Sequence, residues 1–326
     1  MLSVNSALVL SFVMFAGNLI LFLSFAGKHN SFQQNEDFAP PLEDKIMLKT
    51  SVRSQKSSLL SDVTTLLWEE MNPSQQQEAY AIVLPYLKSH ADLVKNRANN
   101  GKGRWQLPSY DYSCTAKLVG KGWSGHHLCT DLLENLTTCQ FFSFGIARAY
   151  SFEKDLSDIF HCHGFAADPT VDYNSNMYKN ITFQQLGAQL LIPNEEQRNN
   201  KDGQSWWVAN VPLLKKTLGV KHLNILKMDC EGCEYALARD IIKHDPTFFD
   251  HVDQFAVEIH LAKEWLKDQE TLYYYGMLLK MLKDSGFRLH HTGCASCSPE
   301  HTKTGCIEDF ICKNGNRCHN YLFAKA

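Results

Sequence analysis

One stretch of the chain, LNILKMDCEGCEY at residues 223–235, constrains the fold more than any other. Its apolar run, Leu223–Met228, predicts a buried strand, and helical spacing of apolar residues follows up to Ile242. Three acids lie at the junction: Asp229, Glu231 and Glu234. Ligands of open parallel α/β sheets bind beyond the carboxyl ends of the strands, which makes these acids site candidates. The alternative is that they only begin the helix, by accepting hydrogen bonds from its free amides.

The segment before this stretch predicts another strand and helix. Residues 139–145, CQFFSFG, have the pattern of a strand that ends in a glycine, and Ser151–Phe160 has the spacing of a helix. A glycine at this point lets a ligand approach the backbone closely, because no Cβ stands in the way. Gly145 is followed by Ile-Ala-Arg rather than by the further glycines of a dinucleotide-binding fingerprint, so it is a weak signal alone.

Two more predicted strands carry side chains that can bind a ligand. The first, Gly164–Asp168, ends in an acid 23 residues beyond Gly145. Nucleoside-binding folds place a carboxylate for the ribose hydroxyls about 20 residues beyond the first glycine. The second is His251–His260, in which Glu258 and His260 share one face because they are two residues apart.

Length and composition fit one domain of catalytic size behind an N-terminal extension. The chain has 326 residues, 44% of them hydrophobic, which suits a domain of about 200 to 230 residues. We expect a membrane segment at 1–27, a stem at 28–58, a helical accessory region at 59–104 that is broken near Asn72-Pro73, and the main domain at 105–326. The net charge is −3 and no basic cluster accompanies aromatic residues, so nucleic acid is not an expected partner.

The N-terminal residues predict a membrane helix. No charged side chain occurs from Leu2 to Gly27, and residues 7–26 are long and apolar enough to cross a bilayer. This run exceeds the roughly 7 to 15 apolar residues of a signal peptide, which favours an uncleaved signal anchor. Ser24-Phe-Ala26 nevertheless fits a cleavage site. Lys28 follows the span and no Lys or Arg precedes it, so the positive-inside rule does not support a lumenal body.

Cysteine usage favours an oxidising compartment. Eleven cysteines are present, and five of them lie in a Cys-rich insertion at 294–318. In a lumen this density predicts disulfides, whereas in the cytosol it would predict metal ligands. Cys294-Ala-Ser-Cys297 is half of a zinc site without a regular second pair, so we prefer disulfides. We also predict a disulfide-tied loop ending at Cys129, with His126 and His127 solvated.

These features together predict a single-pass membrane protein. Its body would face the lumen of the endoplasmic reticulum or Golgi, or would be secreted if the N-terminal segment is cleaved. Two glycosylation sequons, at Asn135 and Asn180, fit secretion, but sequons also arise by chance.

Four of the segments described above, taken together, resemble an enzyme family. They are FFSFG at 141–145, FAADP at 165–169, ILKMDCEGCE at 225–234 and FAVEIH at 255–260. In this order they resemble the FkbM-type S-adenosylmethionine-dependent methyltransferases, and with the anchor and the cysteines they are most similar to the animal methyltransferase-like protein 24 group. The resemblance covers about residues 105–326. It implies an α/β fold of the Rossmann-like class I type, with a mostly parallel seven-stranded sheet, an antiparallel last strand and helices on both faces.

The resemblance also implies roles for individual residues. Ser143, Phe144 and Gly145 would line the methionine and ribose side of S-adenosyl-L-methionine. Asp168 would accept hydrogen bonds from the ribose hydroxyls, and Asp229 would face the methyl group and the methionine amine.

Methyl transfer also requires a group that takes the proton of the acceptor. Transfer from a sulfonium is an in-line displacement, so the enzyme chiefly aligns the acceptor oxygen and removes its proton. We prefer His260 or Glu231 as the base, while Glu234 and Glu258 remain alternatives and each has a structural interpretation as well. A second hypothesis is that Asp229, Glu231 and His260 hold a divalent cation that lowers the pKa of the acceptor hydroxyl.

We therefore predict O-methylation of a hydroxyl on a glycan or a small molecule of the secretory pathway, with S-adenosyl-L-methionine as cofactor. The alternative is a catalytically inactive, membrane-anchored binding or scaffold protein on the same fold, which the solitary glycine at residue 145 favours.

Overall fold

A computed structural model describes residues 12–15, 18–21, 65–95, 113–173, 178–191, 206–261, 266, 268–296 and 318–325. It divides the chain into two units, residues 1–53 and 54–326. In the first unit, Phe12–Phe15 (β1) pairs antiparallel with Asn18–Leu21 (β2). The rest of the expected membrane segment, and the expected stem, lie outside the described residues. Among the described helices, none has the length and apolar character needed to cross a bilayer.

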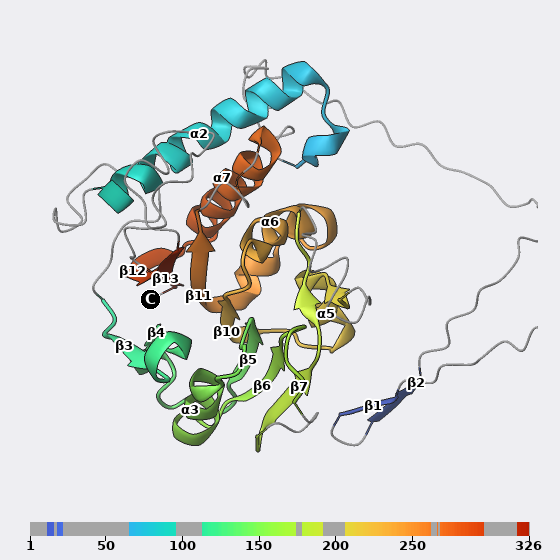
Figure 1. The fold of residues 1–326 in the computed structure, drawn as a ribbon, viewed down its shortest axis with the longest axis vertical. Helices are drawn as coiled ribbons and strands as arrows, with labels where there is room; N and C mark the ends of the chain where they lie inside the picture. Colours follow the sequence, from blue (N-terminus) through green and yellow to red (C-terminus); the bar gives the residue numbers. More distant parts are fainter. Residues whose placement is uncertain are drawn as a thin grey trace, which may run out of the picture. The chain divides into compact units, whose positions relative to one another are not determined.

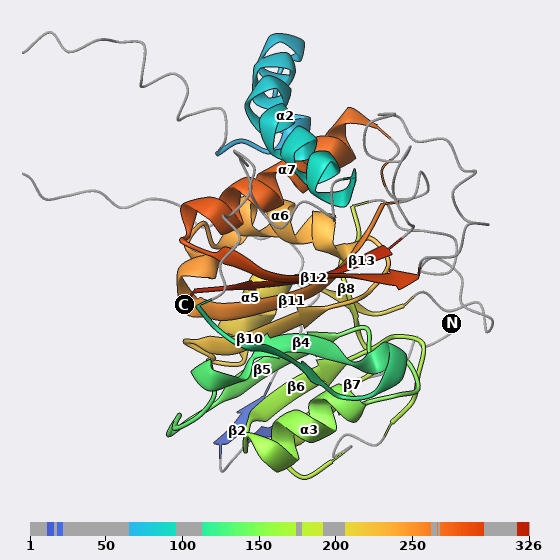
Figure 2. The same cartoon turned by 90° about the vertical axis from the view of Figure 1, so that its left-hand side faces the viewer.

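A seven-stranded sheet organises the second unit (Figures 1 and 2), in the order β12-β13-β11-β10-β5-β6-β7. In chain order its strands are Gln140–Phe144 (β5), His163–Ala167 (β6), Ile181–Gln184 (β7), Leu223–Met228 (β10), Val252–His260 (β11), Arg288–Ser296 (β12) and Cys318–Ala324 (β13). Strands β5, β6, β7, β10 and β11 pair in parallel, whereas β13 pairs antiparallel with both of its neighbours. This confirms the predicted mostly parallel sheet with an antiparallel last strand.

The direction in which the chain adds strands reverses beside β5. From β5 the chain moves outward to β6 and β7, and it then returns to place β10 and β11 on the other side of β5. In an open α/β sheet such a switch point opens a crevice at the carboxyl ends of the strands, where ligands bind. The ends of β5 and β10 are therefore the first place to look for a site.

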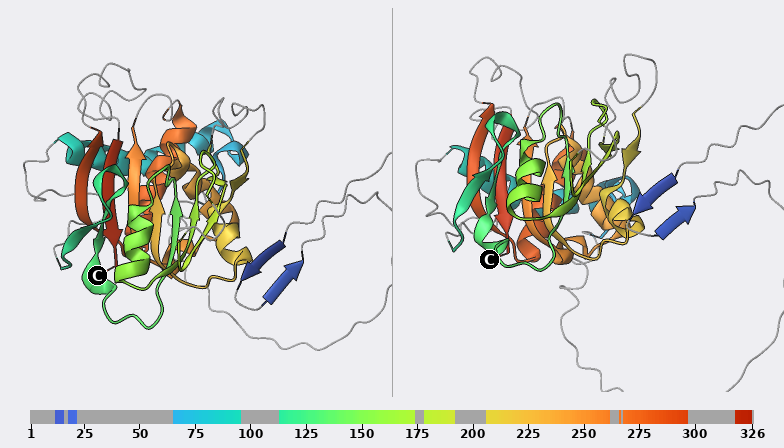
Figure 3. Two further views of the ribbon diagram at one scale, coloured as in Figure 1. Left: turned by 60° about the horizontal axis from the view of Figure 1, so that its bottom comes forward. Right: turned by 90° about the horizontal axis from the view of Figure 1, so that it is seen from below.

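Alternate side chains of the strands fill two cores, one on each face of the sheet. Phe142, Phe144 and Leu226 pack with one set of helices: Val211–Thr217 (α5), Cys233–His244 (α6) and Gln269–Asp284 (α7). Phe141 and Ile225 point the other way, toward Ser151–Ile159 (α3) and the hairpin of Ala116–Val119 (β3) and His126–Cys129 (β4). Figure 3 shows α3 and the outer helix α2 on opposite sides of the sheet.

Helix α2, Pro73–Lys95, packs on α7 and forms an outer layer. It begins at the break predicted from Asn72-Pro73, and Asn72 Oδ1 accepts hydrogen bonds from the first free amides. The buried imidazole of His90 lies 2.5 Å from the hydroxyl of Tyr275 in α7 and 2.5 Å from that of Tyr321 in β13. One side chain thus ties α2 to both a helix and a strand.

The remaining elements are short. They are the strand pair Gly187–Ala188 (β8) and Val208–Ala209 (β9), and the 3₁₀ turns Trp68–Glu70 (η1), Gly122–Ser124 (η3), Thr130–Leu132 (η4) and Phe248–His251 (η5).

Three disulfides lie within the described residues: Cys114–Cys129, Cys139–Cys162 and Cys230–Cys233. The first confirms the predicted disulfide-tied loop. The predicted links within the Cys-rich insertion fall outside the part of the chain whose side chains the structure describes.

The prediction that His126 and His127 are loop residues was wrong, and so was the prediction that His126 is solvated, whereas His127 is partly exposed. Both belong to β4, and the side chain of His126 is only 2% exposed. The hairpin folds over the α3 face of the sheet, and β4 packs beside β11 and β13. This long-range packing buries a histidine that looks exposed in the sequence.

Candidate active site

The strand ends that carry Gly145 and Asp229 touch each other. The N–H of Asp229 donates to the carbonyl of Phe144, and the N–H of Gly145 donates to the carbonyl of Ala167 at the end of β6. Gly145 has φ 75°, and a Cβ added there would lie 1.6 Å from the carbonyl oxygen of Asp229. Only glycine satisfies both the conformation and the close approach at this position.

Asp168, directly after β6, joins the same group. Its Oδ2 accepts a hydrogen bond of 2.7 Å from the N–H of Ala147, two residues beyond Gly145. Its Oδ1 accepts from the N–H and the hydroxyl of Thr170 at 2.7 and 2.6 Å. A carboxylate offers about four lone-pair sites, and donors among the described residues use three of them, which leaves one for a ligand. Asp168 therefore fixes the loop after Gly145 and can still accept one further hydrogen bond.

Ser143 and Phe144 are both placed at this site, but their side chains are turned into the protein. The hydroxyl of Ser143 donates to Oε1 of Glu153 in α3 at 2.5 Å. The ring of Phe144 is buried against Phe142 and Phe165. Because both side chains are buried, a ligand can meet only the backbone of this segment.

A buried polar group that the sequence did not predict lies beside Asp229 on the α3 face. Lys227 Nζ donates to the carbonyls of Phe144 and Gly145 and lies 3.9 Å from Asp229 Oδ2. His126 Nε2 lies 3.7 Å from the same oxygen. Glu153 Oε2 and His126 Nε2 are buried, and within the described part of the chain neither has a partner at hydrogen-bond distance. Native proteins seldom leave such atoms unpaired, so their presence here points to a ligand or to ordered water.

The charges of this group depend on burial and on the neighbouring basic side chains. Burial alone would raise the pKa of Asp229, but Lys227, His126 and His260 together lower it to about 2. Burial lowers the pKa of His126, against the opposing effect of Asp229. Burial raises the pKa of Glu153, and Lys227 opposes this rise. At neutral pH Asp229 is therefore an anion and His126 is uncharged.

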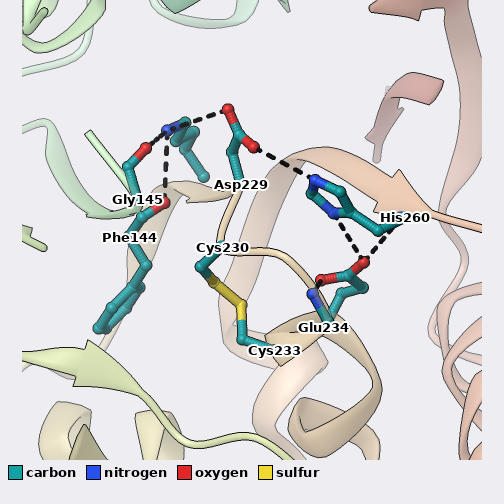
Figure 4. The surroundings of a disulfide bond; sticks show 9 residues. Phe144, Gly145, Asp229, Cys230, Cys233, Glu234 and His260 are labelled. Carbon is teal, nitrogen blue, oxygen red and sulfur yellow. Dashed lines mark hydrogen bonds and ion pairs between the residues drawn. A yellow bond between two sulfur atoms is a disulfide. The ribbon is translucent and has the colours of Figure 1, made fainter. Parts of the chain in front are cut away.

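The other side of Asp229 faces the end of β11 (Figure 4). His260 Nε2 lies 3.9 Å from Asp229 Oδ1. The same nitrogen lies 3.6 Å from Glu258 Oε1. His260 Nδ1 lies 3.1 Å from Oε1 of Glu234, which belongs to the first turn of α6. Glu234 is fully buried and holds His260, so it does not lie on the exposed surface of the helix.

The turn between Asp229 and α6 has an unusual backbone. Glu231 and Gly232 have φ values of 56° and 105°, and the disulfide Cys230–Cys233 spans the turn. This conformation leaves the side chain of Glu231 exposed while Asp229 and Glu234 turn inward. Of the two predicted bases, His260 therefore lies in the buried cluster beside Asp229, and Glu231 lies at the surface of the turn.

Sequence reasoning missed Lys227, Glu153 and His126. A lysine inside the apolar run Leu223–Met228 was the one visible signal, because a lysine in a fully buried strand needs partners. Nothing in the sequence pattern distinguishes Glu153 from a surface acid of an amphipathic helix, and only the fold of the hairpin brings His126 across the sheet.

The strand order and the acids at the switch point define a Rossmann-like α/β protein with its ligand site at the strand ends. Residues 51–305 match the family model described as a methyltransferase domain, and the chain belongs to this methyltransferase family. This confirms the coarser part of the predicted resemblance, while the closer similarity to FkbM-type enzymes and the methyltransferase-like protein 24 group stays a prediction.

Solved structures with a similar fold are remote from this chain. A Methanococcus jannaschii fibrillarin pre-rRNA processing protein is 12% identical over 58% of this chain and 66% of its own, with a TM-score of 0.29. M. jannaschii TYW2 in complex with AdoMet is 8% identical over 67% and 90%, with a TM-score of 0.26. The plantazolicin methyltransferase BpumL in complex with SAH is 8% identical over 82% and 96%, with a TM-score of 0.26. No curated protein matched. At these identities and TM-scores the solved structures add nothing to the family assignment.

Proposed function

We propose that the protein is an S-adenosyl-L-methionine-dependent methyltransferase of the FkbM type that methylates a hydroxyl oxygen. Membership of a methyltransferase family supports the reaction class. The observation that carries the proposal is the meeting of three strand ends at the switch point. Asp168 accepts from the backbone just after Gly145, and Gly145 in turn lies against the carbonyl of Asp229. An adenosyl ligand needs these groups side by side.

The cofactor would be held mainly by backbone on one side and by acids on the other. The segment from Ser143 to Gly145 would present its backbone to the cofactor, because the side chains of Ser143 and Phe144 are buried in the protein. The open lone pair of Asp168 suits a ribose hydroxyl. The unpaired polar atoms of Glu153 and His126, beside the anion of Asp229, suit the charged methionine end.

Methyl transfer itself would take place where Asp229 turns toward β11. The enzyme must align the acceptor oxygen with the sulfonium methyl group and let the oxygen lose its proton. Of the predicted catalytic residues, Asp229 and His260 lie together at this point, with Glu258 beside them. We therefore assign the loss of the acceptor proton to this cluster and not to the exposed Glu231.

We further propose that the body of the protein lies in the lumen of the endoplasmic reticulum or Golgi, anchored by residues 1–27. Disulfides persist in oxidising compartments, so the three described pairs support a lumenal position. A hydroxyl on a glycan is the acceptor that fits this compartment, and a small molecule is the alternative.

Calorimetry of the full-length chain with S-adenosyl-L-methionine tests the proposal. We expect saturable binding, and Asp168→Ala should raise the dissociation constant at least about tenfold, because a ribose hydrogen bond to an anion is lost. Asp158→Ala is a matched control. Asp158 lies in α3 and pairs with Lys154 of the same helix and with Lys179 before β7, so its loss should leave the dissociation constant of the cofactor unchanged. Absence of binding to the wild type would favour the inactive binding or scaffold protein instead.

A further inference from the structure

Two acids and a histidine converge at the ends of β10 and β11. Asp229 directly follows β10, and Glu258 and His260 lie two residues apart on β11, which pairs in parallel with β10. One oxygen of Asp229, one of Glu258 and His260 Nε2 all lie within 4.8 Å of one another. Asp229 contributes Oδ1 here, while its Oδ2 faces Lys227 and His126 on the other side. The two oxygens of the Asp229 carboxylate thus face two different groups of side chains.

Glu234 fixes the orientation of the His260 ring. The carboxylate is fully buried, and it accepts hydrogen bonds from the N–H of Gly232 at 3.0 Å and from the N–H of His260 at 2.8 Å. Its Oε1 is also 3.1 Å from His260 Nδ1. Since a carboxylate oxygen only accepts, Nδ1 carries a proton, and Nε2, which faces Asp229 and Glu258, is the ring nitrogen that a metal ion can bind. Histidines that bind metal ions are commonly held by a carboxylate in this way.

Two carboxylates and an imidazole nitrogen that face one point can be held together by a proton on the ring or by a metal cation that takes the place of this proton. Ligand atoms around an ion at about 2.1 Å are about 3.0 Å apart in octahedral and about 3.4 Å apart in tetrahedral coordination. The separations from Nε2, 3.6 and 3.9 Å, exceed these values by less than 1 Å. Rotations of two carboxylate side chains are enough to close this difference.

We propose that Asp229, Glu258 and His260 bind a divalent transition-metal cation, such as Mn²⁺ or Zn²⁺, at the methyl-transfer site. One imidazole and two carboxylates are a donor set that these ions accept. Three protein ligands leave coordination positions open, and an acceptor hydroxyl can occupy one of them. Asp229 and Glu258 are partly exposed, so the cluster is open to ligands on one side.

This inference rests on the proposed function, because it explains how the acceptor loses its proton. A hydroxyl bound to the cation has a lowered pKa and releases its proton to water. The resulting oxygen anion forms a bond to the methyl carbon while the carbon–sulfur bond breaks. The products are the methyl ether, S-adenosylhomocysteine and one proton, so that atoms and charge balance. His260 then acts as a metal ligand instead of a base.

A metal titration tests the site without any methyl transfer. The full-length chain is treated with a chelator and then titrated with Mn²⁺ alone, and binding is followed by calorimetry and by the electron paramagnetic resonance signal of the ion. We expect one ion per chain. His260→Ala and Glu258→Gln should each weaken binding at least about tenfold, and Glu234→Gln should weaken it by about 10 to 100-fold through the orientation of His260.

Asp253→Asn is the matched control. Asp253 lies on the same strand as Glu258 but at its other end, where it accepts hydrogen bonds from Asn224 and His222. Loss of this charge should leave Mn²⁺ affinity unchanged. Equal losses in Asp253→Asn and Glu258→Gln would mean that the ion responds only to net charge, and this would overturn the proposal.

Binding of S-adenosyl-L-methionine by the same variants separates the two proposals. Retained cofactor binding by His260→Ala shows that the variant is folded. If the wild type binds the cofactor but neither Mn²⁺ nor Zn²⁺, the metal site is refuted and the methyltransferase proposal stands. If it binds the metal through these residues but not the cofactor, the metal site stands and the proposed function fails.

Discussion

At the scale of single residues, the site depends on a backbone contact. Gly145 allows the ends of β5 and β10 to approach until its Cα faces the carbonyl oxygen of Asp229. The same contact positions Asp229, whose side chain faces His260 with one oxygen (Figure 4) and Lys227 with the other. A substitution at residue 145 should therefore impair methyl transfer by displacing the backbone of Asp229, and not by removing a side-chain contact.

Gly145→Ala should destabilise the protein and weaken cofactor binding. The added Cβ collides with backbone, and φ 75° disfavours alanine, so we expect the free energy of unfolding to fall by about 2 to 4 kcal/mol. Gly219→Ala is the control, because Gly219 has φ 68° but no atom within 4 Å of the added Cβ. Urea unfolding followed by circular dichroism should show a clearly larger loss for Gly145→Ala, and equal losses would contradict the collision.

At the scale of elements, α2 is attached through an uncharged histidine. His90 lies between the hydroxyls of Tyr275 and Tyr321. Burial, with a smaller effect of His319, lowers the pKa of His90 to about 3. Protonation would place a charge inside the layer between α2, α7 and β13. The outer layer should therefore be held more weakly in acid.

His90→Gln should reduce the dependence of stability on pH. The unfolded chain binds the His90 proton below a pKa of about 6.5, and the folded chain does so only near 3, so stability from this group is complete above pH 6.5 and declines as the pH falls toward 3. Each pH unit within this window lowers the free energy of unfolding by up to about 1.4 kcal/mol. Between pH 6.5 and 4.5, the wild type should therefore lose up to about 3 kcal/mol more than the variant.

Urea unfolding of both proteins at several pH values provides the measurement. The other histidines are common to the two proteins, so their contributions cancel in the difference. Parallel curves for wild type and His90→Gln would show that His90 already takes up its proton in the folded state.

The sequence predicts the ends of the strands better than it predicts which side chains pack together. The ends of β5, β6 and β10 were recognisable because a glycine or an acid interrupts an apolar run at Gly145, Asp168 and Asp229. The burial of His126 was not predictable, because it depends on a hairpin that crosses from an earlier part of the chain. The number and directions of the strands came from the resemblance, and their order was not predicted, since spacing along the chain does not say which strands are neighbours.

At the scale of the whole molecule, three disulfides within the described residues connect a hairpin, two strands and a turn. Cys114–Cys129 closes the hairpin that carries His126, Cys139–Cys162 joins the segments before β5 and β6, and Cys230–Cys233 spans the turn after Asp229. All three therefore lie in or beside the elements that form the site, and disulfides of this kind persist in oxidising compartments, which is the basis of the proposed lumenal position.

Peptide mapping of the full-length protein under non-reducing conditions should find these three pairs linked when the chain is made through the secretory pathway. The chemical reason is that thiols this close oxidise in a lumen and stay reduced in the cytosol. The same protein made in a reducing cytosol is the comparison. Free thiols at all six positions in the secretory product would contradict the lumenal assignment.

The short covalent ring formed by Cys230 and Cys233 has a consequence for ligand recognition. Because the ring holds a left-handed segment closed, the residues on either side of it, Asp229 and Glu234, are preorganised before any ligand arrives. Little conformational entropy is then lost on association at this point, and selectivity arises from fit to a rigid template. A protein with the ring opened would have to order the segment anew each time a ligand binds.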